Sequence, residues 1–131
     1  MTLRDHFRKL FTIILEDYPI QYREIVKLSG IRKARIIDDN EAIIIGFKNK
    51  RIKITNDIPE TKIPTGYYSK ESIITLLDGQ LSLNDAVKLG LIDCTGKLSE
   101  ILKFWDILQI IIYVSSRSIR AYRLWSEYKQ G

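Results

Sequence analysis

The sequence contains little cysteine, histidine or proline, with one Cys, one His and three Pro among 131 residues. A single cysteine, Cys94, excludes an internal disulfide, and one thiol is typical of a reducing compartment, so we expect a cytoplasmic protein. Together with His6 it supplies too few ligands for a zinc site, and Asp78 and Asp85 suit a turn and a helix cap. We therefore expect no metal and no cofactor.

Long apolar runs are also absent. The most apolar segment, 104–114, contains Asp106 and Gln109 and falls short of the roughly 18 residues that a membrane span needs. Arg4 and Asp5 interrupt the N-terminal segment, which does not resemble a secretory signal. We expect segment 104–114 to form a buried core helix.

The common signatures of catalysis are missing as well. G-x-G-x-x-G, G-x-x-x-x-G-K-[ST], G-x-S-x-G and H-E-x-x-H do not occur. Cys94 would need a base to act as a nucleophile, but His6 lies far along the chain and we expect it to face solvent. A buried core thiol is the simpler interpretation. The sequence therefore leans against an enzyme and assigns no catalytic residue.

The charge is moderately basic, because 21 Lys and Arg against 16 Asp and Glu give a net charge of +5. Basic side chains gather at 48–53 and at 117–129. Such charge favours anionic partners or surfaces in general. Without an aromatic ladder on a strand or helix-turn-helix spacing, we expect no nucleic-acid partner.

The N-terminal half predicts two helices followed by a sheet. Apolar spacing over 3–14, with Thr2 as the cap, indicates one helix. A second helix begins near Pro19 with Asp17 as its cap and stops at Gly30. After Gly30 the period of the hydrophobic pattern changes to two, which is typical of strands. Strands are expected at 32–38, 41–47, 51–55 and 61–67, and Pro64 would confine the last of these to a sheet edge.

The C-terminal half predicts two short helices that stop at Gly79 and Gly90, capped by Ser69 and Ser82. Strand 91–95 and a long apolar helix follow. This order is typical of an α+β fold. We expect a single domain, 1–131, divided into N-terminal helices (1–30), a core (31–115) and a basic aromatic C-terminal helix or tail (116–131).

The segments RKARIID, EAIIIGF, TKIPTGYY, ESIITLLDGQ, SLNDAVKLG and LIDCTGKLSEIL follow one another in a distinctive order. In that order they resemble the sterol carrier protein type 2-like family of non-specific lipid-binding domains, over roughly residues 20–110. The resemblance implies a curved five-stranded mixed sheet with helices packed over one face. It also implies an apolar tunnel between them that accepts fatty acyl, sterol-like or isoprenoid chains.

Two functions follow from this resemblance. The leading hypothesis is non-catalytic binding or transfer of a hydrophobic ligand, and the alternative is an accessory protein of the same fold that holds a partner enzyme. The apolar surface could equally form a filled core, which the sequence leaves open. The candidate lining residues are Ala42, Ile44, Ile63, Tyr67, Ile73, Leu77, Leu98, Leu102 and Trp105.

The C-terminal tail alternates cations with aromatic residues. Such a helix suits a membrane interface or a partner groove. A helix packed on its own domain through Ile119, Tyr122 and Leu124 is the simpler alternative. The candidate contact residues for a membrane or partner are Arg117, Arg120, Tyr122, Arg123 and Trp125.

Overall fold

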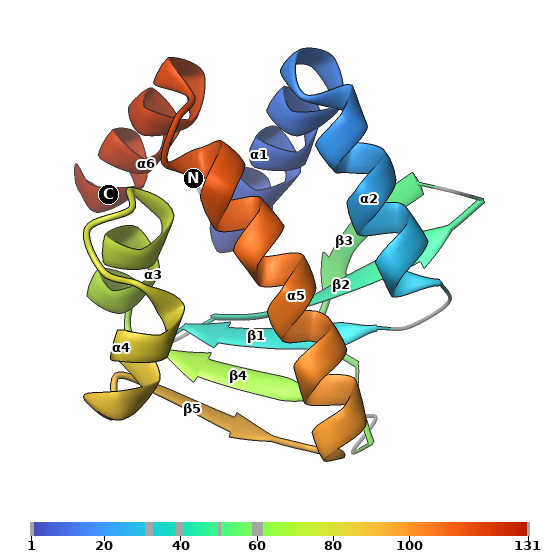
Figure 1. Ribbon diagram of the computed structural model, residues 1–131. Coiled ribbons are helices and arrows are strands. Elements are labelled where there is room, and N and C mark those ends of the chain that lie inside the picture. The colour runs from blue at the N-terminus through green and yellow to red at the C-terminus, as the bar shows by residue number, and fades with distance from the viewer. Residues whose placement is uncertain (1, 31–32, 39–40, 50, 59–61, 131) are drawn as a thin grey trace.

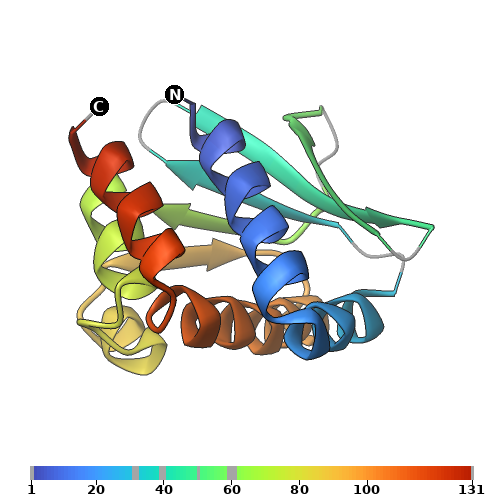
Figure 2. The same ribbon diagram turned by 90° about the horizontal axis from the view of Figure 1, so that it is seen from above.

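The computed structural model describes residues 2–30, 33–38, 41–49, 51–58 and 62–130. One face of a twisted five-stranded sheet is covered by helices (Figures 1 and 2). The elements in chain order are α1 (Leu3–Asp17), α2 (Pro19–Ser29), β1 (Ala34–Asp38), β2 (Glu41–Lys48), β3 (Arg51–Asn56), β4 (Thr65–Tyr68), α3 (Lys70–Leu77), α4 (Leu83–Lys88), β5 (Ile92–Thr95), α5 (Leu98–Ser115) and α6 (Ile119–Gln130). The predicted α+β architecture with a mixed sheet is confirmed.

The strand order is β3-β2-β1-β4-β5, in which β1 and β4 are parallel and the other pairs are antiparallel. The prediction that Pro64 confines the fourth strand to an edge is wrong, because β4 lies between β1 and β5. Pro64 immediately precedes the strand, where its missing N–H interrupts no ladder. Its carbonyl accepts a hydrogen bond from the Arg35 N–H at 2.9 Å.

Helix starts follow the predicted caps at three of four places. Thr2 forms a capping box with Asp5, and Ser69 and Ser82 each accept a hydrogen bond from the first helical turn. The exception is Asp17. Helix α2 begins after Tyr18 without a side-chain cap, and the Asp17 carboxylate instead accepts a hydrogen bond from Arg120 at 3.0 Å.

The tail forms α6, which lies beside α1 and runs antiparallel to it (Figure 2). Its buried face carries Ala121, Leu124, Trp125 and Tyr128. Of the three packing residues predicted, only Leu124 is buried, because Ile119 and Tyr122 lie on the opposite side of the helix. Residues 121, 124, 125 and 128 form the face of α6 that contacts α1.

His6 lies in the interface between α1 and α6, so the prediction that it faces solvent is wrong. Its side chain is 2% exposed, and its ring lies 4.7 Å from the Tyr128 ring and 6.1 Å from that of Trp125. Helix α6 covers this side of α1, which the periodicity of α1 alone does not reveal. His6 Nδ1 lies 2.8 Å from the Thr2 carbonyl oxygen, while Nε2 has no hydrogen-bond partner among the described residues.

Two glycines with positive φ provide a matched test of a close backbone contact. A Cβ at Gly96 (φ +130°) would come within 2.9 Å of the Pro64 Cα, whereas at Gly90 (φ +71°) it would meet nothing within 4 Å. We expect Gly96→Ala to lower the free energy of unfolding by about 3 kcal/mol and Gly90→Ala by about 1 kcal/mol. Urea denaturation measures both values. Equal losses would contradict the contact between Gly96 and Pro64.

The burial of His6 predicts a pH effect on stability. Desolvation lowers the pKa of the folded-state imidazole below its ordinary value of 6.5, and the hydrogen bond to Thr2 offsets this only in part. The unfolded chain therefore binds a proton that the folded chain does not, and stability falls as pH drops below about 6.5 towards the lowered pKa.

We expect His6→Phe to be less sensitive to this pH change than the natural chain, because Phe keeps the ring contacts but cannot be protonated. Urea unfolding at about pH 7.5 and pH 5.5 gives the difference in unfolding free energy for each chain. The same pH difference in both chains would show that His6 is not responsible.

Candidate ligand-binding site

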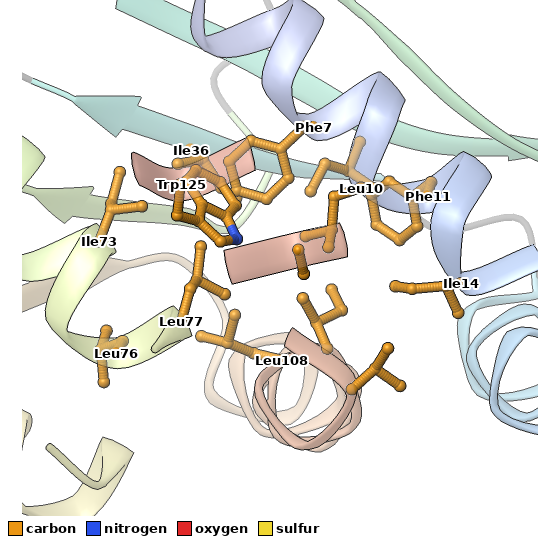
Figure 3. Packing of buried hydrophobic residues seen from close by; sticks show 14 of the residues in the cluster. Phe7, Leu10, Phe11, Ile14, Ile36, Ile73, Leu76, Leu77, Leu108 and Trp125 are labelled. Atoms are coloured by element: carbon orange, nitrogen blue, oxygen red, sulfur yellow. The ribbon is translucent and has the colours of Figure 1, made fainter. Parts of the chain in front are cut away.

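An apolar cavity lies where the resemblance places a tunnel, between the sheet and the helices. Its volume is about 10 Å³, room for roughly one water molecule. Figure 3 shows side chains of α1, α3 and α5 converging on this region around Trp125. The cavity is lined by Phe7, Ile36, Tyr68, Ile73, Leu76, Leu77 and Leu108.

Gly66 makes room for the aromatic side of the cavity. It pairs with Ile36 in the parallel β1–β4 ladder, and a Cβ there would come within 2.6 Å of the Tyr68 ring. The Tyr68 phenol therefore occupies the space over the sheet that a side chain at position 66 would fill. Burial raises the pKa of Tyr68 strongly, so its hydroxyl stays neutral across the physiological range.

A polar cluster formed by Asp38, Tyr128, Lys70 and His6 adjoins this region, and all of its members are buried except Lys70, which is half-buried. Asp38 pairs with Tyr68 across the β1–β4 ladder and accepts a hydrogen bond from the Tyr128 hydroxyl. The Lys70 ammonium lies 4.7 Å from the centre of the Tyr128 ring, and His6 packs against the same ring. Ligand pockets in proteins are commonly apolar with a few polar groups, and this region has that composition.

Sequence patterns do not reveal this cluster, because its members come from four different elements. Asp38 and Tyr128 are 90 residues apart, so no local spacing connects them. One signal was present: a carboxylate at the end of a strand whose other residues are largely apolar.

Of the predicted lining residues, Ile73 and Leu77 on α3 contact the cavity. Trp105 is partly buried and packs against the core. Leu98 and Leu102, on the first turns of α5, are 68% and 53% exposed. They lie at the rim of the helical layer and not in its interior.

Of the four remaining candidates, Ala42, Ile44 and Tyr67 lie on the other face of the sheet, and Ile63 precedes β4. Ile43 and Ile45 belong to the core beneath the helices, so Ala42 and Ile44 point away from it. Ile63 is buried and Tyr67 is exposed; the latter alternates with the core residue Tyr68. None of these four residues lines the apolar cavity. The reason is that β2 is apolar on both faces, and a period of two does not tell which face meets the helices.

On the second face of the sheet, Asp57 and Ile58 after β3 and Thr65 at the start of β4 all contact Arg35. Arg35 on β1 donates hydrogen bonds to the Asp57 carboxylate at 2.7 Å, to the Ile58 carbonyl at 2.8 Å and to the Thr65 hydroxyl at 3.2 Å. This Arg35 clamp ties Asp57 and Ile58 to β1. Ile44 is buried on that side, with 2% exposure.

The five predicted contact residues of the tail have different surroundings. Trp125 is 2% exposed and donates a hydrogen bond from Nε1 to the Ser115 hydroxyl, so it is a core residue. Arg120 bonds to Glu16 and Asp17 of α1 at 3.0 Å. Arg117 lies over the Tyr113 ring, 3.8 Å from its centre. The exposed residues Tyr122 and Arg123 complete the set.

The single thiol is poorly suited to nucleophilic chemistry. Burial and the neighbouring Asp93 raise the pKa of Cys94, which keeps it protonated. Within the described ranges, no three His, Cys, Asp or Glu side chains gather as metal ligands. Nor does any helix in the described part of the chain combine the length and apolarity needed to cross a membrane.

Solved structures share this arrangement. The sterol carrier protein domain 2 of Helicoverpa armigera aligns with a TM-score of 0.61 and 17% identity, covering 88% of each chain. The protein described as "UbiJ-SCP2 Ubiquinone synthesis protein" aligns with a TM-score of 0.60 and 12% identity, covering 79% of this chain and 90% of the other. Palmitated SCP2L2 from Aedes aegypti gives 0.58 and 15%, covering 82% and 95%.

No family model matches the sequence, and no curated protein sequence matches it. The similarity is therefore one of fold. The chain has the sterol carrier protein 2-like fold, as its sequence pattern predicted.

The polar cluster predicts an unequal effect of two tyrosine substitutions on α6. We expect Tyr128→Phe to lower the free energy of unfolding by about 1–3 kcal/mol, because buried Asp38 loses a hydrogen-bond donor. Tyr122→Phe is the control, since Tyr122 is 66% exposed and should cost less than about 0.5 kcal/mol. Thermal or urea unfolding measures both. A neutral Tyr128→Phe would contradict the contribution of this bond.

Proposed function

We propose that the chain binds a hydrophobic molecule without changing it chemically, and that the apolar part of the ligand lies between the sheet and helices α1, α3 and α5. The observation that carries this proposal is the wholly apolar lining of the cavity in that place. Fold similarity to a palmitated SCP2L2 supports a fatty acyl chain, and similarity to a ubiquinone synthesis protein supports an isoprenoid one.

Binding requires the cavity to enlarge. Ligand sites usually have volumes of roughly 300–1,000 Å³, whereas this cavity has about 10 Å³. The first half of α5 is the element best suited to move, because Leu98 and Leu102 are exposed there while Ile107, Leu108 and Ile111 farther along are buried. Displacing this half would open the core beside Leu108 and offer two leucines to the ligand.

The affinity would come mainly from apolar burial, at about 25 cal/mol per Å². The free energy of opening the cavity subtracts from this gain. Selectivity among chains of similar shape should therefore be weak, and the polar cluster at Asp38 would favour ligands that carry a polar end.

A truncation inside the cavity tests the proposal. Leu108→Ala removes a lining side chain, whereas Ile111→Ala makes a comparable truncation at a buried residue of the same helix that does not line the cavity. Each should cost roughly 2–5 kcal/mol of stability. We expect only Leu108→Ala to bind a fluorescent fatty acid several-fold more tightly than the natural chain. The truncation already provides part of the space that the ligand needs.

Fluorescence titration of delipidated protein measures this affinity, and circular dichroism checks that both variants are folded. Equal affinities of the two variants would contradict binding at this cavity. Failure of the natural chain and of folded Leu108→Ala to bind any probe would contradict the proposed function.

A second candidate is an accessory protein that holds a partner enzyme. The small volume of the cavity favours it, because a filled core needs no ligand. Native mass spectrometry separates the two functions. Retained lipid supports the first, and a protein that co-purifies in a fixed stoichiometry supports the second.

A further inference from the structure

A groove on the outer side of α1 shares no lining residue with the apolar cavity. It has a volume of about 590 Å³ and runs between α1 and the edge strand β3. The residues that line it include Arg8 on α1 and Arg51 and Lys53 on β3, and none of the described residues that line it is acidic. Arg51 and Lys53 alternate with Ile52 and Ile54, so their side chains leave the edge strand on the face away from α1, and an occupant must span the edge of β3 to reach them. We call it the β3 groove.

The floor of the β3 groove is apolar. Ile54, Phe11 and Tyr22 are buried there, with 4%, 5% and 8% exposure, and Ile52 is half-buried. Leu15, at the end of the groove on α1, is 48% exposed. The groove therefore offers an apolar contact surface flanked by three cations.

The edge of β3 is already partly occupied. The Ile52 N–H donates a hydrogen bond to the Tyr22 hydroxyl at 3.1 Å, and Arg8 donates one to the Ile54 carbonyl at 3.1 Å. A strand added to this edge would have to displace both side chains. An occupant must therefore bind through its side chains and not through a backbone ladder.

The elements that flank the groove are long enough to contact two turns of a helix. Residues 8–15 of α1 span about 10 Å, or two helical turns, and strand residues 51–55 span about 13 Å. Two turns present side chains at i, i+3, i+4 and i+7, the spacing by which amphipathic helices bind grooves.

We propose that the β3 groove docks an acidic amphipathic helix of a partner protein. Its apolar face lies on Leu15 and Ile52, and its carboxylates pair with Arg51 and Lys53. No ion pair of Arg51 or Lys53 is found within the described part of the chain, so these two charges need not exchange partners on binding. This docking is independent of ligand binding in the core.

The shape of the groove argues against two other anionic partners. A bilayer surface cannot reach a recessed floor in which Phe11 and Tyr22 are buried. Single-stranded nucleic acid needs exposed aromatic rings on which to stack, and the two rings here are not exposed. A helix that projects into the groove can use both its floor and its walls.

The test uses the full chain and a designed helical peptide of about four turns, with leucine on one face and glutamate beside it. A scrambled peptide of the same composition is the control. Chemical-shift mapping of the isotopically labelled protein should show changes confined to α1 and β3, and fluorescence anisotropy of the labelled peptide gives the affinity.

Arg51→Glu with Lys53→Glu should weaken binding at least tenfold, and Leu15→Glu should do the same. The charge-matched control is Lys88→Glu with Lys103→Glu, both exposed and outside the groove, and the apolar control is Leu89→Glu. Both controls should change the affinity less than about twofold. Thermal unfolding confirms that all variants are folded.

Three results would overturn the proposal. They are equal binding of the scrambled peptide, equal loss of affinity in the groove variants and their controls, and no binding of the acidic helix at about 1 mM, the weakest affinity that counts as docking. Anionic vesicles or an oligonucleotide that bind through Arg51 and Lys53 when the peptide does not would assign the groove to that other partner.

Discussion

The packing of Trp125 against α1 is the interaction on which the helical layer depends. Its ring lies 5.7 Å from that of Phe7, edge to face, and its Nε1 bonds to Ser115 at the end of α5. One side chain therefore joins the last helix to the first and to the long helix beside it. The apolar cavity between these helices and the sheet has a volume of about 10 Å³.

This arrangement explains why the interior and the exterior of the helical layer differ in character. The buried half of α5 and the inner faces of α1 and α3 meet around Trp125, whereas the first turns of α5 extend beyond this packing and leave Leu98 and Leu102 exposed. A hydrophobic ligand would bind beside the first turns of α5, which lie outside this packing. A protein partner would use the outer side of α1, where Phe11, Tyr22 and Ile54 of the β3 groove belong to the same core.

Local patterns in the sequence were enough to predict most elements and their order. Thr2, Ser69 and Ser82 cap helices as expected, because capping depends on residues three positions apart. The faces were harder to predict. Ile43 and Ile44 have the same side-chain chemistry, and only pairing with the rest of the sheet decides that Ile43 meets the helices. The buried position of His6 likewise depends on α6, more than 100 residues away in the chain.

The Arg35 clamp has a consequence for the order of folding. The hairpins β1–β2 and β2–β3 join neighbours in sequence, but β4 pairs with β1 only after the chain has crossed the sheet. Such a non-local closure has an entropic cost before its contacts form. By binding Asp57, Ile58 and Thr65 together, one guanidinium fixes both ends of the crossover. The parallel pair is therefore expected to form late, and Arg35 is the side chain that retains it once formed.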